Sequence, residues 1–289
     1  METPVLSPAL ESAISEALGR PVDSTTYLAS GAANHIFRVR CGQDTVVAKI
    51  SKVNEPDLFA CEAEGLRHMA ATRTVHVPEV IAVSEHFLLM EDLGDEAKDL
   101  DDAGWRTFGA QLGAMHQVRH DTFGYTRDNY LGIWPQANPP TADWVDFYYT
   151  NRVHCYLDSG KNPQVLTAAD RDGIYRLCER MRDLIPDQKP SLCHGDLWMN
   201  NIYRKASGRV YVFDPAIHFG LPEADLAMTQ LYFFFPEAFY DGYREAHPLE
   251  ADWKERLPLY QLKELLLMIA QFEHAESLAT LRELIARYR

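Results

Sequence analysis

The sequence lacks the features that would make it a membrane or secreted protein. No stretch approaches the roughly 20 consecutive apolar residues of a membrane-spanning helix, so we expect no membrane partner. The amino-terminal segment has no basic region followed by an apolar core, as a secretory signal would. The five cysteines are odd in number and form no CxxC pair, which favours buried, reduced thiols in a cytoplasmic protein.

Basic residues are also scarce. Lys and Arg number 28 against 42 Asp and Glu, which gives a formal net charge of −14. Such a surface repels phosphate backbones, so we expect no nucleic-acid partner. A nucleotide ligand remains compatible with this charge, because one local basic group and a metal ion can hold its phosphates. With 289 residues, 46% of them hydrophobic, the chain can bury a sizeable core in one or two domains.

Hydrophobic periodicity predicts that β-strands dominate the first part of the chain, after one initial helix. An initial helix is expected between a Ser7 cap and Gly19. Residues 25–50 alternate as strands do, and a helical pattern at 55–71 follows. Two further short strands are predicted at 80–83 and 87–90.

The predicted secondary structure changes after Gly94, where helical patterns begin to dominate. One strand pair interrupts them, at 201–203 and 210–213, joined by a Ser-Gly turn. We therefore expect an α+β fold, with a small β-rich lobe at 1–92 and a larger helical lobe at 93–289.

The most specific motif is HGDLWMNN at residues 194–201, followed by FDP at 213–215. In the protein-kinase pattern a catalytic Asp precedes a metal-binding Asn by five positions, and Asp196 and Asn201 have this spacing. A second acidic metal ligand follows a strand pair, and Asp214 stands in that place. Phosphoryl transfer from ATP needs a carboxylate base and oxygen ligands for Mg²⁺. The pattern predicts Asp196 as the base and Asn201 and Asp214 as the metal ligands.

A phosphate-binding lysine is expected at Lys49, which ends the run VVAK in a predicted strand. Its carboxylate partner should come from the following helix, where Glu62 and Glu64 are candidates. Two residues apart on a helix point about 200° apart, so only one of them can face the lysine. We favour Glu62.

Two further segments are expected to contact the nucleotide. The loop between the first two strands, which includes Gly31, Ala32 and Asn34, is placed to cover the phosphates, although it is not a GxGxxG sequence. The segment 90–93 joins the two predicted lobes. Its backbone can pair with the hydrogen-bonding edge of adenine, and it contains Met90, Glu91 and Leu93.

Several motifs resemble the fructosamine (ketosamine) kinase family, which belongs with aminoglycoside phosphotransferases and choline kinases. They are HGDLW with its Asn, FACEAEGL at 59–66, DNYLG at 128–132, PQAN at 135–138, EADLAM at 223–228 and YQL at 260–262. The resemblance covers nearly the whole chain. It implies the two-lobed protein-kinase-like fold, with ATP bound by the first lobe and the acceptor by the second.

The resemblance also implies a reaction and an acceptor site. Family members transfer the γ-phosphate of ATP to the third-carbon hydroxyl of a ketosamine, either a small molecule or a glycated protein lysine, and the unstable product then releases the amine. The ring of Trp198, two residues after the base, is expected to border the sugar. Polar contacts are expected from Asp128, Asn129 and Gln136, and support for the catalytic loop from His194 and Asp225.

Two alternatives remain open. One is another small-molecule kinase of the same fold, of the aminoglycoside or choline type, against which the Trp of HGDLW and the 128–138 loop argue. The other is a pseudokinase without activity, against which the intact lysine, base and metal ligands argue. The chain departs from the family after YQL, where residues 263–268 read KELLLM instead of the usual His and aromatic residues.

Overall fold

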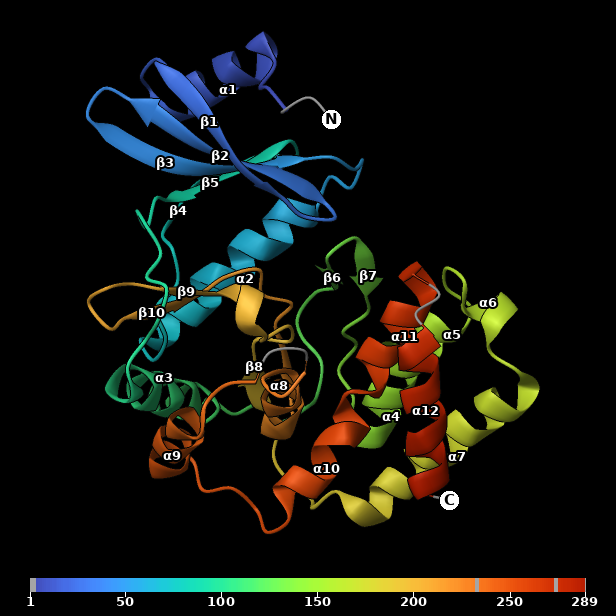
Figure 1. The fold of residues 1–289 in the computed structure, drawn as a ribbon. Coiled ribbons are helices and arrows are strands. Elements are labelled where there is room, and N and C mark those ends of the chain that lie inside the picture. Colours follow the sequence, from blue (N-terminus) through green and yellow to red (C-terminus); the bar gives the residue numbers. More distant parts are fainter. Residues whose placement is uncertain (1–3, 232–233, 273–274, 289) are drawn as a thin grey trace. The chain divides into compact units, whose positions relative to one another are not determined.

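The computed structural model describes residues 4–231, 234–272 and 275–288 (Figure 1). The chain forms two compact units. The first comprises the chain up to Gly104 together with Asn129–Pro135 and Asn201–Ala216. The second comprises Trp105–Asp128, Gln136–Asn200 and the chain from Ile217 onward. The first unit therefore takes in three segments that lie beyond residues 1–92 in sequence, namely 93–104, 129–135 and 201–216.

The first unit is built on a five-stranded antiparallel sheet in the order β1-β2-β3-β5-β4 (Figure 1). The strands are β1 (Ser24–Ser30), β2 (Asn34–Cys41), β3 (Asp44–Ser51), β4 (Val80–Val83) and β5 (Phe87–Glu91). Helix α1 (Pro8–Leu18) begins where the Ser7 hydroxyl accepts the Leu10 amide proton, and it ends at Gly19 with φ +66°. Its Ile14 packs with Phe37, Val39 and Ala48 in a core on one face of the sheet.

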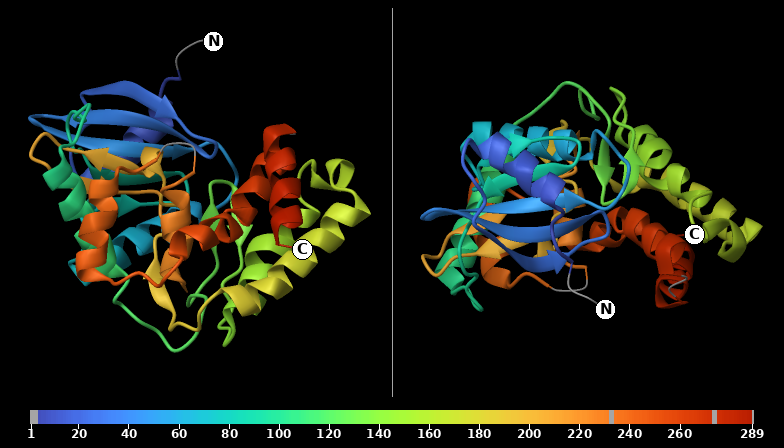
Figure 2. Two further views of the ribbon diagram at one scale, coloured as in Figure 1. Left: turned by 60° about the horizontal axis from the view of Figure 1, so that its bottom comes forward. Right: turned by 90° about the horizontal axis from the view of Figure 1, so that it is seen from above.

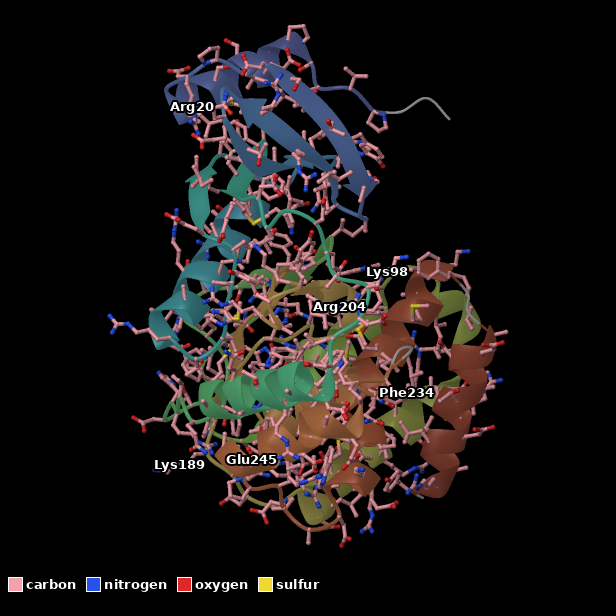
Figure 3. The ribbon with its side chains drawn as sticks, turned by 60° about the vertical axis from the view of Figure 1, so that its left-hand side comes forward. Arg20, Lys98, Lys189, Arg204, Phe234 and Glu245 are labelled. Atoms are coloured by element: carbon pink, nitrogen blue, oxygen red, sulfur yellow. The ribbon has the colours of Figure 1, made fainter. Side chains whose placement is uncertain are left out.

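Helix α2 (Leu58–Thr72) packs against β4 and β5 of the same unit. The segment 201–216 adds the hairpin β9 (Ile202–Arg204) and β10 (Val210–Val212), which bridges back to the chain after α2 between Tyr211 and His76. Arg204, labelled in Figure 3, pairs with Glu96 at 2.9 Å. The segment 129–135 contributes β6 (Asn129–Leu131), which packs on α2 and pairs with β7 (Trp134–Gln136).

The second unit is mostly helical, and its helices cluster around buried aromatic side chains such as Phe147, Tyr148, Tyr156 and Tyr260. Helices α7 and α12 lie side by side (Figure 2). The helical segments are α3 (Asp102–Met115), α4 (Trp144–Tyr148), the π-helix η1 (Tyr149–His154), α5 (Cys155–Leu157), α6 (Asn162–Val165), α7 (Ala168–Leu184), the 3₁₀-helix η2 (Met199–Asn201), α8 (Pro222–Met228), α9 (Glu237–Ala246), α10 (Trp253–Tyr260), α11 (Leu262–Phe272) and α12 (Ala275–Arg287).

A two-stranded pair positions the functional loop of this unit. Strand β8 (Ser191–Cys193) leads directly into the HGD segment, and β11 (His218–Gly220) leads into α8. The two strands are antiparallel, with Cys193 opposite His218. Because the strands run antiparallel, the chain leaves the pair at opposite ends: the HGD segment follows Cys193, beside His218, whereas α8 follows Gly220, beside Ser191. The contact between the HGD segment and α8 is made by Asp225, further along the helix.

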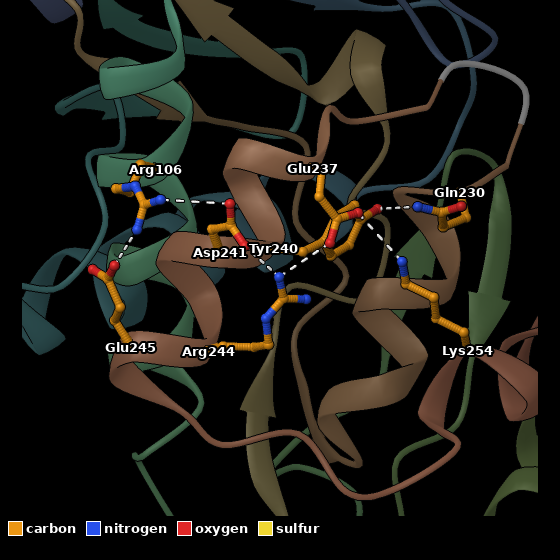
Figure 4. Close-up of polar contacts among 8 residues, drawn as sticks. All are labelled: Arg106, Gln230, Glu237, Tyr240, Asp241, Arg244, Glu245 and Lys254. Atoms are coloured by element: carbon orange, nitrogen blue, oxygen red, sulfur yellow. Dashed lines mark hydrogen bonds and ion pairs between the residues drawn. The ribbon is translucent and has the colours of Figure 1, made fainter.

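Surface ion pairs link α3, α9 and α10 (Figure 4). Arg106 reaches Asp241 at 3.4 Å and also Glu245, while Lys254 reaches Glu237 at 3.3 Å. These side chains are all substantially exposed, so each pair contributes only a few tenths of a kcal/mol up to about 1 kcal/mol.

Most of the predicted elements are confirmed, including the capped first helix, the hairpin at 202–212 and the helical character of the second half. The very short strands β6, β7, β8 and β11 and the π-helix were not predicted. Of the five free cysteines four are buried, but Cys155 is exposed, contrary to the expectation of buried thiols. Within the described residues, no helix is both long and apolar enough to cross a membrane.

Candidate active site

Lys49 lies on the face of β3 opposite the core. Ala48 and Ile50 belong to the hydrophobic core, so strand alternation turns Lys49 to the other side. Its side chain is only 2% exposed, and its ammonium lies 2.5 Å from Oε1 of Glu62. Asp214 forms a second ion pair with it. A buried ammonium needs such partners, because an unpaired charge at this depth would be strongly disfavoured.

Glu62 reaches the lysine because it lies on the buried face of α2. Phe59 and Leu66, three residues before it and four after it, share that face and are buried, and the Glu62 side chain is 12% exposed. The helix thus aims one of the two candidate glutamates, Glu62, at the sheet.

Asp214 and Asn201, the predicted metal ligands, are both in the first unit. The amide of Phe213 donates to the carbonyl of Asn201 at 3.1 Å, which ties the two segments together. Asp214 has a φ of +55°, a left-handed conformation that Asp tolerates better than most residues and that often marks a functional position. A carboxylate and an amide oxygen are the donors that Mg²⁺ prefers, so these residues fit that ion.

A cavity of about 210 Å³ lies beside Lys49 within the first unit. The predicted residues Met90, Glu91 and Leu93 line it. Asp92, which is part of the predicted segment 90–93, lines it too. Val47 was not predicted to contact the nucleotide, although it lies on the same face of β3 as Lys49. The other lining residues without such a prediction are Leu28, Ala29, Ile36, Arg38, Pro78, Gly94, Tyr203 and Phe213.

The segment after β5 is fixed by side chains from elsewhere in the first unit. Arg38 Nε lies 2.7 Å from Asp92, and Arg38 also donates to the Gly94 carbonyl at 2.9 Å. The hydroxyl of Tyr203 donates to the same carbonyl at 2.6 Å. Burial alone would raise the pKa of Asp92, but hydrogen bonds from Gly94, Thr45 and Arg38 outweigh it and lower that pKa. The cavity wall is therefore held rigidly.

The predicted phosphate loop is the β1–β2 turn. The amide of Gly31 donates to the carbonyl of Asn34 at 2.9 Å, which closes the turn. The ammonium of Lys52 donates to the Gly31 carbonyl at 2.7 Å, a contact that sequence reasoning missed. Ala32 lies at the exposed tip of this turn.

The HGD loop of the second unit is held by Asp225. This buried carboxylate accepts the amide protons of His194 at 2.6 Å and Gly195 at 2.9 Å. The amide of Asp196 donates to Nδ1 of His194 at 3.2 Å, and Asp196 is partly exposed. The structure thus gives His194 and Asp225 the contacts that would support the loop.

Behind Asp225 lies a residue that the sequence did not single out, His116. Its Nε2 is 3.2 Å from Asp225 and its Nδ1 is 2.7 Å from the hydroxyl of Tyr243. Burial alone would raise the pKa of Asp225, but the hydrogen bond from His116, the nearby His194 ring and the Gly195 amide lower it to about 2. Cys193 lies close to His116 and Asp225, and burial raises the pKa of its thiol well above the usual range.

The predicted acceptor residues are distributed over both units. Trp198 is partly exposed in the second unit, which differs from a fully buried core tryptophan. Asp128 accepts the Asn138 amide proton at 2.8 Å, and Gln136, only 1% exposed, donates to the hydroxyl of Tyr156 at 3.2 Å. Asn129 is buried in the first unit.

Arg152, on the π-helix, is 1% exposed and fastens the loop that contains Gln136. It donates to the carbonyl of Ala137 at 2.9 Å and also contacts the side chain of Asn138. Burial lowers the pKa of Arg152 to about 10. π-Helical turns are frequent at functional sites, and here the turn aims a cation at the loop backbone.

Comparison with known proteins gives a consistent family. The fructosamine kinase family model matches residues 6–288. A probable ketoamine kinase of Synechocystis sp. is 32% identical over 280 residues, covering 91% of this chain and 92% of that protein.

Solved structures agree. The crystal structure of a candidate fructosamine-3-kinase from Thermobifida fusca superposes with a TM-score of 0.88 at 31% identity, covering 98% of this chain and 99% of that one. The aminoglycoside phosphotransferase APH(2″)-IIa, solved with streptomycin and ATP, has a TM-score of 0.68 at 16% identity over 98% of this chain and 97% of its own, which shows the shared kinase-like fold alone. The chain belongs to the fructosamine kinase family and is an ATP-dependent phosphotransferase with an alcohol group as acceptor.

Proposed function

We propose that this enzyme phosphorylates the 3-hydroxyl of ketosamines, such as fructosamine and ribulosamine adducts, and so leads to deglycation. The observation that carries the proposal is the match to fructosamine kinases along residues 6–288, which includes the HGDLW segment with its tryptophan. The acceptor is a small ketosamine or a glycated protein lysine. We propose no nucleic-acid partner, because the net charge of −14 repels phosphate backbones, and no membrane partner.

In the proposed reaction Asp196 accepts the proton of the attacking hydroxyl, and the hydroxyl oxygen displaces ADP from the γ-phosphorus. Its carboxylate suits this role because it is partly exposed while the backbone on its amino-terminal side is hydrogen-bonded. Lys49, oriented by Glu62, holds the phosphate oxygens. Asn201 and Asp214 hold Mg²⁺, which neutralises phosphate charge when bound.

The adenine is proposed to occupy the cavity beside Met90, Glu91 and Leu93. An extended backbone presents the donor and the acceptor that one edge of adenine requires. The Arg38–Asp92 ion pair supports this placement, because it fixes the backbone that would read the base. The division into a nucleotide-binding lobe at 1–92 and a catalytic, acceptor-binding lobe at 93–289 remains part of the proposal.

The proposal is tested by ADP release with a panel of ribose-, erythrose- and fructose-derived ketosamines, and with kanamycin and choline for comparison. We expect turnover with at least one ketosamine, and with it a phosphorylated product and the free amine. The matched control is Asp196→Asn, which should bind ATP but lose about 10²–10⁴-fold in kcat. If kanamycin or choline were turned over faster than every ketosamine, the proposal of a ketosamine acceptor would be wrong, and only the kinase activity would remain.

A further inference from the structure

Gly195 is the residue of the HGD loop whose backbone conformation is least restricted by its own side chain. Its φ is +86°, a region open to glycine but strained for other residues. The peptide group between Gly195 and Asp196 sets the direction of the Asp196 side chain. A glycine without restraint could rotate this peptide, and the carboxylate would turn away with it.

Both the N–H and the C=O of that peptide group are hydrogen-bonded. On its amide side, Asp196 N–H donates to Nδ1 of His194 at 3.2 Å. On its carbonyl side, Gly195 C=O accepts from the ammonium of Lys263 at 2.8 Å. The preceding peptide is held too, because Gly195 N–H donates to Asp225 at 2.9 Å. Lys263 thus completes a set of restraints on both sides of one glycine.

Lys263 stands in a costly place for a lysine. It is 6% exposed, and it lies in the first turn of α11, where the helix dipole disfavours positive charge. Glu264 partly compensates, with its carboxylate 3.3 Å from the ammonium. If the side chain at position 263 only filled space, an apolar residue of similar length would make the fold more stable. The hydrogen bond to the HGD loop therefore explains why a lysine stands at this position.

The start of α11 is itself anchored. The hydroxyl of Tyr148 donates to the carbonyl of Tyr260 at 2.9 Å and accepts the amide proton of Lys263 at 3.4 Å. Gln261 donates to the carbonyl of Ala227 at 3.0 Å, on the same helix that carries Asp225. Lys263 and Asp225 therefore approach Gly195 from elements that are bonded to one another.

We propose that Lys263 is a positioning residue for the catalytic base: its ammonium fixes the Gly195–Asp196 peptide, and this fixes the direction of the Asp196 carboxylate. The inference rests on the proposed role of Asp196 as the base. It concerns the loop within the second unit and does not depend on which acceptor is phosphorylated.

The test compares Lys263→Met, which keeps length but removes the charge, with Lys263→Arg, which keeps a cationic donor. Lys254→Met is the matched control, since Lys254 lies on the neighbouring helix α10 and pairs with Glu237 at the surface (Figure 4). Amide hydrogen exchange, measured without any acceptor, reports the loop directly. We expect exchange of the Gly195 and Asp196 amides to rise about tenfold or more in Lys263→Met, with α7 unchanged.

In turnover assays Lys263→Met should lose about 10- to 100-fold in kcat, as expected for a lost charge-assisted hydrogen bond, with KM for ATP within about twofold of wild type. Lys263→Arg should recover most of the loss, and Lys254→Met should match wild type in both assays. The proposal is overturned if Lys263→Met fails to fold, exchanges uniformly faster, keeps its kcat, or behaves like Lys263→Arg. A wild-type enzyme inactive on every ketosamine would refute the proposed function instead, and the exchange comparison would still decide this inference.

Discussion

Lys49 and Glu62 form a buried ion pair in which the ammonium nitrogen lies 2.5 Å from the carboxylate oxygen. The lysine is 2% exposed, so losing the glutamate leaves the ammonium with Asp214 as its remaining described ion-pair partner. Lys49→Ala and Glu62→Ala should each lower kcat/KM for ATP strongly. Because the glutamate acts through the lysine, the double variant should be little worse than Lys49→Ala, with a coupling energy of about 1–3 kcal/mol in a double-mutant cycle.

Glu64→Ala is the matched control, since Glu64 lies on the same helix about 200° around from Glu62. It should leave kcat/KM nearly unchanged and should add independently to Lys49→Ala. A coupling energy between Lys49 and Glu64, with none between Lys49 and Glu62, would mean that the Lys49–Glu62 ion pair is not the one that supports activity.

Asn201 and Asp214 should set the Mg²⁺ dependence of the reaction. Asn201→Ala removes a neutral oxygen ligand, so higher Mg²⁺ should restore part of the lost activity. Asp214→Ala removes a charged ligand and also a partner of Lys49, so its loss should be larger and should resist added Mg²⁺. The measurement is kcat/KM for ATP across a Mg²⁺ titration. An unchanged Mg²⁺ dependence in both variants would remove these residues from the metal site.

The candidate site residues could be singled out because they occur in a fixed order along the chain, although their roles remain predictions. The five-residue spacing from Asp196 to Asn201, and the strand pair before Asp214, are local patterns that a sequence displays directly. The same holds for the face of β3 that carries Lys49, since period-two alternation is visible in VVAKI.

The support of the loop by Asp225 was implied by the family resemblance, but the other supporting contacts could not be predicted, because they join residues far apart in sequence. Lys263 lies 68 positions from Gly195, and His116 lies 127 positions from Tyr243. No local pattern in the sequence indicates contacts between residues so far apart along the chain, because these contacts form only when helices pack together. The strands β8 and β11 were missed because three residues are too few to show alternation and no short turn joins the two strands. The equally short β9 and β10 could be predicted because a Ser-Gly turn lies between them.

Trp198 should contribute to acceptor binding. It is partly exposed and follows Asp196 by two residues, so its ring can offer an apolar face to a sugar. Trp198→Ala is expected to raise KM for the ketosamine about tenfold while KM for ATP stays within about twofold, and Trp198→Phe should keep much of the affinity. If Trp198→Ala unfolds the protein, or changes neither constant, the tryptophan is structural and the acceptor binds elsewhere.

A second prediction about a buried charge concerns stability alone. Asp170 closes a capping box with Thr167 at the start of α7 and receives two hydrogen bonds of 2.9 Å from Arg282 of α12. The hydrogen bonds from Arg282 lower the pKa of Asp170 to about 2; burial opposes this, and bonds from Thr167 add to it. A lowered carboxyl pKa stabilises the fold above the ordinary pKa of about 4, and that stabilisation is lost as the pH falls toward 2.

Asp170→Asn should therefore lower the free energy of unfolding near pH 7 by about 2 kcal/mol, with kcat of the folded enzyme unchanged. The difference from wild type should shrink below about pH 4, because protonated Asp170 and asparagine are then both neutral. Urea unfolding at several pH values measures this. The control is Asp172→Asn on the same helix, whose pair with Arg176 is exposed and should be worth only a few tenths of a kcal/mol at any pH. A pH-independent deficit in Asp170→Asn would mean that lost packing or capping, rather than the charge that Arg282 recognises, holds α7 to α12.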